Sequence, residues 1–372
     1  MAAEVTDKQA DAKRYLIEPA VCKICGHVQL IEALDIDMYG NYLYTPSYSD
    51  EFQNYITTFI DSVECLGTGK RAVEIGSSNG FLIKKMQERG YDVLGVEPSE
   101  TLVEEARLNG VATMHMCFGN DDSIRSIKEW GTPDVVVMRH VMEHLDDLHG
   151  IIEAVGSILD KGIFVIEVPW LLRIIKEKQF YAFFHEHLSY FSMTSIKRLV
   201  EAHGFRIIDI RENNLEGGSI AVYVCKGEWA PVNLDKISFY LELENKWCSI
   251  DRIIDFSNEA DEQISRIRKQ VAAEKQEGKR IAAWGAGQRG VTLINICEWN
   301  VADIDYIIDA NRNYWWKYIP GANVQIVPPE WLEEHWVDAI IIMATGYADE
   351  IIAQNKKYIK QGGKFLLLET MS

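Results

Sequence analysis

The stretch RAVEIGSSNGFLIKKMQERGYDVLGVEPSE (71–100) constrains the fold more than any other part of the chain. An apolar run at Ala72–Ile75 leads into a Gly76-Ser-Ser-Asn-Gly80 turn, and a helical pattern begins near Phe81. A second apolar run ends in Glu97, about 20 residues after the turn. This order of strand, glycine turn, helix, strand and acid is typical of a doubly wound α/β fold.

The residues of this stretch also suggest a ligand. Gly76 allows a sharp turn, and Gly80 would let a ligand approach the N-terminus of the helix closely. Glu97 closes the second strand, where an acid binds ribose hydroxyls in such folds. The glycine spacing is G-x-x-x-G, which differs from the G-x-G-x-x-G of dinucleotide binders. The alternative is a plain turn between strand and helix that simply needs glycine.

Four segments separate along the 372 residues. Residues 1–35 are a short polar leader that contains CKICG, and residues 36–230 alternate strand-like and amphipathic runs, as in an α/β domain. Residues 231–278 carry apolar positions at helical spacing and predict a helical connector. Residues 279–372 restart the alternation and predict a second, smaller α/β domain.

Composition excludes several classes of partner. A net charge of −18 argues against nucleic acid and anionic membranes, because binding to phosphates needs a basic face. No apolar run reaches the roughly 18–20 residues of a membrane span, and the N-terminus lacks the apolar core of a signal peptide. Seven scattered cysteines are typical of reduced thiols. We therefore expect a cytoplasmic protein, either a monomer or a homodimer.

A second chemical cluster follows the strand in PDVVVMRHVMEHLDDL (133–148). His140, Glu143 and His144 lie near its carboxyl end, where α/β folds bind ligands. His140 and His144 have the i,i+4 spacing of a helix, so zinc has to be considered. An H-E-x-x-H pattern and a third ligand are both missing, which argues against zinc.

The third cluster is FFHEHLSYFS (183–192), between the strand KGIFVIEVPW and a helix that Ser192 or Thr194 can cap and Gly204 can end. In an extended backbone His185 and His187 would share one face. A metal site would need another ligand, and none is apparent nearby. A general base would need a histidine with a pKa near neutral. The alternative is that these histidines only line the entry to the helix.

Taken together, these motifs resemble a known family. The glycine turn with its acid resembles the first motif of class I S-adenosylmethionine (SAM)-dependent methyltransferases. IEVPW, HEHLSYFS, EGGSIAVYV and LDIDMYGNYLYTPSYS resemble sugar C-methyltransferases that act on nucleotide-linked 4-keto-deoxysugars, and WGAGQRG and IPGANVQIVPPE resemble that family's C-terminal domain. The resemblance implies a Rossmann-like methyltransferase domain, a smaller Rossmann-like domain at the C-terminus, and SAM as cofactor.

The resemblance also implies roles for individual residues. His187 would be the base that enolises the sugar next to its ketone, with Glu186 assisting and His185 and Tyr190 in the same pocket. No metal would be required. The residues expected to bind the cofactor are Glu74, Gly76, Ser77, Asn79, Gly80, Glu97, Pro98, Asn120, His140 and Val141. Those expected to bind the nucleotide sugar are Tyr44, Glu167, Tyr181, Gly217, Gly218, Ser219, Gly285, Gly287 and Gly290.

Three positions depart from the family's pattern. Phe184 stands where the family has tyrosine before H-E-H, and Tyr181 is a candidate substitute. Ala221 stands where the family has an arginine that could pair with a diphosphate. The family begins with a four-cysteine zinc ribbon, but here only Cys22 and Cys25 remain, so we expect no zinc.

The loop Gly285-Ala-Gly287-Gln-Arg-Gly290 has the G-x-G-x-x-G spacing, and Asp309 ends the next strand. This pattern favours an alternative function, an NAD-dependent oxidoreductase. Against it, a domain of about 90 residues is too short for a full dinucleotide fold and a catalytic half. In the resembling family the loop helps to hold the diphosphate. A further alternative is a degenerate SAM-binding scaffold without activity.

Overall fold

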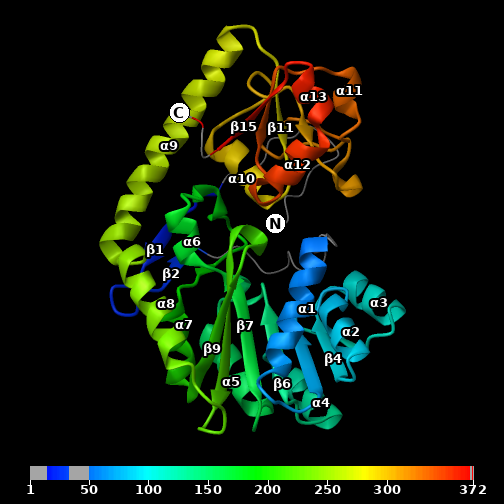
Figure 1. Cartoon of the computed structure of the whole chain (residues 1–372), viewed down its shortest axis with the longest axis vertical. Helices are drawn as coiled ribbons and strands as arrows, with labels where there is room; N and C mark the ends of the chain where they lie inside the picture. The colour runs from blue at the N-terminus through cyan, green and yellow to red at the C-terminus, as the bar shows by residue number, and fades with distance from the viewer. Residues whose placement is uncertain (1–14, 33–49, 369–370, 372) are drawn as a thin grey trace. The chain divides into compact units, whose positions relative to one another are not determined.

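The computed structural model describes residues 15–32, 50–368 and 371, and it divides into two compact units (Figure 1). The larger unit comprises Pro19–Arg173 and Glu186–Ile250, and the smaller unit comprises Ile174–His185 and Asp251–Ser372 with the first 18 residues. The predicted domain boundaries differ from this division in three places, of which the predicted leader, divided between Glu18 and Pro19, is one. Residues 174–185 belong to the smaller unit, and the connector is shared, because its first helix lies in the larger unit.

The larger unit is built on a seven-stranded sheet in the order β5-β4-β3-β6-β7-β10-β9, in which β10 is antiparallel to both of its neighbours. The other pairs are parallel, which confirms the doubly wound α/β prediction. The strands are β3 Arg71–Ile75, β4 Asp92–Glu97, β5 Thr113–His115, β6 Val135–Arg139, β7 Ile163–Pro169, β9 Phe205–Asn213 and β10 Ser219–Lys226.

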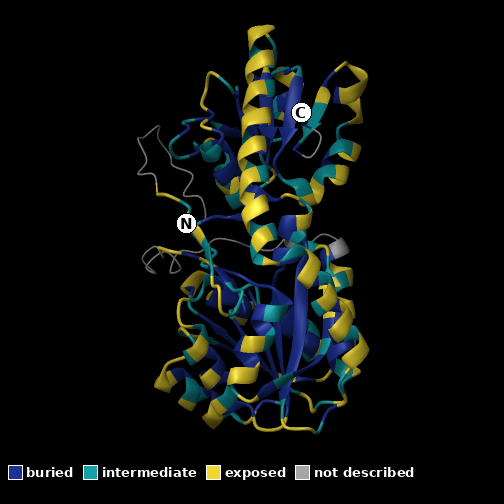
Figure 2. Ribbon diagram, turned by 90° about the vertical axis from the view of Figure 1, so that its left-hand side faces the viewer, coloured by how far each residue is buried: buried dark blue, intermediate teal, exposed yellow. Residues whose placement is uncertain are grey.

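Helices cover both faces of this sheet, so that its central strand β7 is buried along its whole length (Figure 2). One apolar cluster includes Ile152, Val155 and Leu199, and the other includes Ile56, Ile60 and Ile83. The helices are α1 Asp50–Glu64, α2 Phe81–Glu88, α3 Glu100–Leu108, α4 Asp121–Trp130, η2 Met142–His144, α5 Leu148–Ile158, α6 Leu171–Lys176, α7 Met193–Ala202, η4 Leu215–Gly217 and α8 Leu234–Trp247, where η marks a 3₁₀ helix.

A small sheet joins part of the predicted leader to the H-E-H segment. Its antiparallel strands β1 (Pro19–Val21), β2 (Val28–Leu30) and β8 (Ser189–Tyr190) lie in that order. The His27 ring lies against Phe191, and its Nε2 is 3.0 Å from the Ser189 hydroxyl. Residues 19–30 are therefore part of the larger unit and not a separate leader.

The smaller unit contains a five-stranded parallel sheet in the order β13-β12-β11-β14-β15, which confirms the second α/β domain. The long helix α9 (Ile250–Gln276) precedes it, and Gln263 of this helix donates to the Leu368 carbonyl. The remaining elements are η3 Phe180–Ala182, β11 Ile281–Trp284, α10 Gln288–Ile296, β12 Ile307–Ile308, η5 Arg312–Tyr314, β13 Ile326–Val327, α11 Trp331–Glu334, β14 Ala339–Ile342, η6 Thr345–Tyr347, α12 Ala348–Gln354, α13 Lys356–Lys360 and β15 Lys364–Leu367.

Candidate active site

The first glycine turn connects β3 to α2 at the carboxyl edge of the large sheet. Gly76, Ser78 and Gly80 all have positive φ, at 69°, 49° and 77°. A Cβ added to Gly76 would lie 2.3 Å from Cγ2 of Val141, which follows the neighbouring strand β6. Glycine is therefore required at position 76 both by its backbone angle and by the close approach of the β6 loop.

Glu97 at the end of β4 holds this turn in place. Its carboxylate accepts hydrogen bonds from the backbone N–H groups of Ser78 (2.8 Å) and Ser99 (2.9 Å). Burial raises the pKa of Glu97, and burial also raises the pKa of Glu74 to about 8. The acid predicted to bind ribose thus lies beside the turn, as expected from its place in the fold.

The role expected of Gly80 needs correction. An added Cβ would meet Ala106 at 3.2 Å and Val111 at 3.3 Å, which belong to α3 and the segment after it. The absent side chain therefore makes room for the protein's own packing and not for a ligand. The positive φ of Gly80 is a second, independent reason for glycine.

The polar groups around the turn fit a cofactor with hydroxyl and ammonium groups. The hydroxyls of Ser77 and Ser78 and one carboxylate oxygen of Glu74 are buried without a hydrogen-bond partner among the described residues. Buried polar atoms are normally paired, so unpaired ones at the carboxyl edge of the sheet are suited to a ligand. Ribose hydroxyls and the amino-acid part of SAM could pair with these groups.

The other predicted cofactor residues lie on the same edge. Asn79 is buried within the turn, and Pro98 directly follows Glu97. The exposed Asn120 caps α4, where its side chain accepts from the Ser123 N–H at 2.8 Å. His140 and Val141 follow β6, as predicted.

Behind the turn lies a buried ionic network centred on Glu167 of β7. Its carboxylate accepts from Arg139 (2.8 Å), the Tyr55 hydroxyl (2.5 Å) and Asn213 (3.3 Å), and His140 Nε2 lies 3.3 Å away. Although burial opposes ionisation, Arg139 and His140 hold the pKa of Glu167 well below its usual range. Glu167 was expected to bind substrate, but it is fully buried and occupied by these partners, so that prediction is wrong.

His140 belongs to the same network. Its ring lies between Glu167 and Glu143, with Nδ1 3.4 Å from the Glu143 carboxylate. Burial disfavours the charged ring, but the two carboxylates outweigh it and raise the pKa of His140 to about 10. His140 is therefore an imidazolium at neutral pH and cannot act as a base.

The helical zinc pair considered for His140 and His144 does not form. His140 has a left-handed backbone with φ 52°, and only residues 142–144 form a 3₁₀ turn. The structure instead brings Glu143 and His144 to His187, with ligand atoms that all lie within 4.8 Å of one another. The expectation that no third ligand lies near the H-E-H histidines is therefore wrong.

His144 and His187 form the centre of the candidate site. Their rings are 4.9 Å apart and nearly perpendicular, and the ring of Tyr190 lies 6.2 Å from that of His187. Nδ1 of His144 is 2.7 Å from the carbonyl oxygen of Glu186. Since a carbonyl only accepts, Nδ1 carries the proton and Nε2 carries the lone pair. Sequence reasoning did not place His144 in this site, although the MEH segment after β6 was a usable signal.

His185 does not share this environment. Residues 185 and 186 form a turn, so the shared face expected of an extended backbone is absent. The ring of His185 contacts Tyr15, and its Nε2 lies 3.0 Å from the carbonyl oxygen of Leu16. His185 belongs to the smaller unit, while Glu186 begins a segment of the larger one. We therefore withdraw His185 as a contact in the pocket of His187.

Burial raises the pKa of Glu186 to about 7 and lowers that of His144. Near neutral pH the Glu186 carboxyl can therefore hold a proton, and His144 is neutral. Such shifted groups are characteristic of functional sites.

The segment that carries His187 is anchored at its far end. Of the two predicted caps, Ser192 and Thr194, it is Ser192 that caps α7, through a reciprocal pair with Ser195. Glu244 of α8 accepts from the backbone N–H groups of Met193 and Thr194 and from Nε1 of Trp170. A carboxylate at a helix N-terminus satisfies amides that the helix leaves unpaired. This fixes the path of the chain after the H-E-H turn.

Comparison with known proteins shows what the chain is similar to. Residues 50–210 match a family model described as a methyltransferase domain, and residues 214–368 match one described as a C-methyltransferase C-terminal domain. The C-methyltransferase NovU of Streptomyces niveus is 28% identical over 360 residues, which cover 94% of this chain and 85% of that protein. Together, the two models and this relative support a C-methyltransferase.

More distant relatives match about half of the chain. A ubiquinone biosynthesis O-methyltransferase of Idiomarina loihiensis is 25% identical over 44% of this chain and 72% of its own length. A magnesium protoporphyrin IX methyltransferase from Synechocystis, solved with bound S-adenosylhomocysteine, is 16% identical with a TM-score of 0.40, covering 50% of this chain and 90% of that one. The protein is a SAM-dependent methyltransferase, so the oxidoreductase and scaffold alternatives are set aside.

In this C-methyltransferase the missing arginine at position 221 has a structural explanation. Ala221 of β10 is buried and pairs with Glu167, whose other neighbour in register is Arg139 of β6. Residues paired across strands point to the same face. An arginine at 221 would therefore meet Glu167 inside the sheet and not a diphosphate, and Arg139 already supplies that charge.

The other predicted substrate residues are scattered. Ser219 is buried and bonds to the Leu215 carbonyl, and Gly218 packs on Arg173. Gly217 precedes them at the end of η4. The Tyr181 hydroxyl lies 3.3 Å from that of Thr345 in the smaller unit. Tyr44 lies outside the described residues.

The second glycine loop connects β11 to α10 in the smaller unit. Gly285 has φ 109°, and a Cβ on Gly290 would lie 2.2 Å from the Gly285 carbonyl oxygen, whereas Gly287 faces open space. Asp309, after β12, accepts from the N–H groups of Ala286 (2.6 Å) and Asn311 (2.7 Å).

Cys22 and Cys25 form a tight turn in which the Gly26 N–H donates to the Cys22 carbonyl. Nearby backbone N–H groups of Cys25 and Ile24 lower the pKa of the Cys22 thiol. Among the described residues, no group of three metal-ligating side chains includes this pair.

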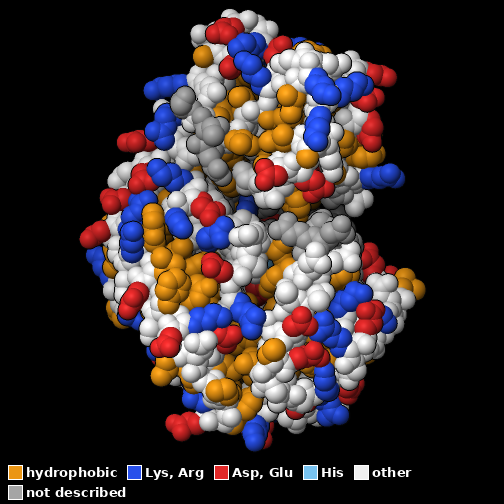
Figure 3. All heavy atoms as spheres, in the orientation of Figure 1, with side chains coloured by type: hydrophobic (Ala, Val, Ile, Leu, Met, Phe, Trp, Pro, Cys, Tyr) orange, Lys and Arg blue, Asp and Glu red, His pale blue; other side chains and the backbone are white. Residues whose placement is uncertain are grey.

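Within the described residues, none of the helices is both long enough and apolar enough to cross a membrane. On the face drawn in Figure 3, lysine and arginine side chains are interspersed with acidic ones.

Proposed function

We propose that this protein methylates a carbon next to the ketone of a nucleotide-linked keto-deoxysugar, with His187 as the general base. The observation that supports it most is the pairing of His187 with His144 after β6 and β7. In α/β folds ligands bind at this edge, and the first glycine turn ends there. SAM supplies an electrophilic methyl group but no base, so the protein has to provide one.

His144 positions the base in this proposal. Its Nδ1–H is held by the Glu186 carbonyl, which leaves the Nε2 lone pair as an acceptor on the ring that faces His187. An N–H of His187 that donates to this lone pair would fix its tautomer and make its other nitrogen the one that takes the proton. A base that is fixed in tautomer and orientation is what proton removal from carbon requires.

The step that the protein's own residues carry out is proton transfer. His187 takes the proton from the carbon next to the ketone, and the electrons of that C–H bond form an enolate. The enolate carbon then accepts the methyl group in line as S-adenosylhomocysteine leaves. The protonated carboxyl of Glu186 and the hydroxyl of Tyr190 are candidates to stabilise the enolate oxygen.

The loop Gly285–Gly290 is proposed to hold the diphosphate of the nucleotide. A helix N-terminus suits an anion, and α10 begins at Gln288 within this loop, with Gly287 as its N-cap. Titration with NAD and with uridine or thymidine diphosphates tests this. A preference for NAD would contradict it.

His187→Asn tests the catalytic role. We expect methyl transfer to fall by about 10²–10⁴-fold, the usual effect of removing a positioned base. SAM binding should stay nearly unchanged, because Glu97 and the glycine turn hold the cofactor. The parent should also exchange deuterium from solvent into the carbon next to the ketone when a non-methylating SAM analogue is bound. Full methyl transfer by the variant would rule out His187 as the base.

A further inference from the structure

The cluster of Glu143, His144 and His187 has the composition of a metal site. Glu143 and His144 lie on η2 after β6, and His187 lies on the segment just before β8. Their ligand atoms lie within 4.8 Å of one another. Bonds of about 2.0–2.1 Å to Zn²⁺ place tetrahedral ligands about 3.4 Å apart. Side-chain rotations that move each ligand atom by about 1 Å would therefore bring the three atoms to bonding distance of one ion.

His144 is already arranged as a ligand. Its Nδ1–H donates to the Glu186 carbonyl at 2.7 Å, which leaves Nε2 with a lone pair. Metal-binding histidines usually donate their other N–H to a carbonyl or carboxylate in this way, which fixes both tautomer and ring orientation.

Glu143 supplies an anionic ligand that the protein itself does not satisfy with hydrogen bonds. The residue is 1% exposed, and neither carboxylate oxygen has a hydrogen-bond partner among the described residues. His140 Nδ1 lies 3.4 Å from one of the oxygens, which leaves the other for an ion.

We propose that Glu143, His144 and His187 bind a divalent transition-metal ion, best Zn²⁺, and that the bound ion inhibits methyl transfer. Two imidazoles and a carboxylate suit Zn²⁺ and leave a fourth position for water. The metal and the substrate proton compete for His187, because both need a nitrogen lone pair. The inhibition rests on the proposed role of His187, whereas the binding does not.

Binding is tested with Co²⁺, whose visible absorption reports its coordination. The experiment uses full-length protein freed of metal by chelator, with Cys22→Ser and Cys25→Ser to remove the thiol pair. We expect one Co²⁺ per chain, displaced by Zn²⁺. Glu143→Gln and His144→Asn should each weaken binding at least 10-fold, as even the loss of an outer hydrogen bond does. His149→Asn is the control, since His149 pairs with His203 elsewhere. If Glu143→Gln and His144→Asn bound Co²⁺ as tightly as the control His149→Asn, the proposed site would be wrong.

Inhibition is tested with labelled SAM and a nucleotide keto sugar. In the same background with Cys22→Ser and Cys25→Ser, Zn²⁺ at the concentration that saturates the Co²⁺ site should abolish methyl transfer, and chelator should restore it. Full activity at saturating Zn²⁺ would overturn the inhibition. If His187→Asn retains methyl transfer while Co²⁺ still binds the parent through the three side chains, the general-base role fails and the metal site stands.

Discussion

The two glycine-rich turns of this protein share one backbone design but differ in the groups beneath them. In each, an acid after the second strand accepts hydrogen bonds from backbone amides: Glu97 from Ser78 and Ser99, and Asp309 from Ala286 and Asn311. Two residues before the first glycine, the larger unit has the buried carboxyl of Glu74, whereas the smaller unit has Ala283. The design of the turn thus sets where a ligand can bind, and the polar side chains beneath it set which one.

The two units also differ in how deeply they bury an ion pair near the turn. The larger unit buries the Arg139–Glu167 pair, with side chains that are 9% and 0% exposed. In the smaller unit, the Arg280–Asp305 pair next to β11 is partly exposed, at 49% and 23%. Matched changes in the two units can therefore show how much burial matters.

The largest effect is expected from Arg139→Met. It leaves Glu167 buried without its main cation, which should cost about 3–5 kcal/mol of unfolding free energy. Arg280→Met is the matched change in the smaller unit and should cost less than about 1 kcal/mol. Urea unfolding followed separately for each unit measures both. Equal losses would show that burial does not distinguish the two pairs.

A pH effect is expected next, from His140. Its folded-state pKa of about 10 lies above the unfolded value of about 6.5, so it stabilises the fold fully below pH 6.5 and loses that contribution as pH rises toward 10. The larger unit should lose about 2 kcal/mol between pH 7 and pH 9. His140→Asn should remove this slope. A slope that persists in the variant would assign it to another group.

Substitution of the acid in each turn shows which of the two turns contributes to SAM binding. Glu97→Gln should weaken SAM binding by about 10-fold, since a hydrogen bond to a charged group contributes about 1.5–3 kcal/mol and some of it is retained. Asp309→Asn should leave SAM binding unchanged. Calorimetry with SAM and each variant measures this. Equal weakening by both would mean that the turns do not differ in ligand.

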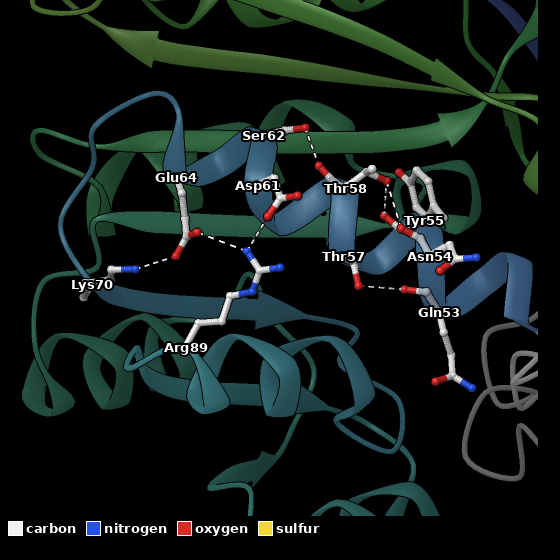
Figure 4. A network of polar contacts seen from close by, with 10 residues as sticks. All are labelled: Gln53, Asn54, Tyr55, Thr57, Thr58, Asp61, Ser62, Glu64, Lys70 and Arg89. Carbon is white, nitrogen blue, oxygen red and sulfur yellow. Dashed lines mark hydrogen bonds and ion pairs between the residues drawn. The ribbon is translucent and has the colours of Figure 1, made fainter.

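The smallest effect is expected from the surface network between α1 and α2 (Figure 4). Arg89 pairs with Asp61 and Glu64, and Lys70 pairs with Glu64. These side chains are partly exposed, so Arg89→Ala should cost only about 0.2–1 kcal/mol and leave SAM binding unchanged. A loss comparable to that of Arg139→Met would contradict the ranking by burial.

Local patterns predicted most of what depends on neighbouring residues. The glycine turn between β3 and α2, the acid at the end of β4 and the Ser192 cap of α7 were all predicted, because each depends on backbone angles and contacts within a few residues. The order of strands and helices likewise predicted both α/β domains.

The sequence by itself therefore determined the fold class, the place of the cofactor turn and the H-E-H segment as a candidate site. Only the tertiary structure decided which side chains meet. It paired His187 with His144, 43 positions earlier in the chain, turned His185 toward Leu16, and enclosed Glu167 among Arg139, Tyr55 and His140. The physical reason is that strands distant in sequence share one sheet edge, and the packing there fixes contacts that no local spacing contains.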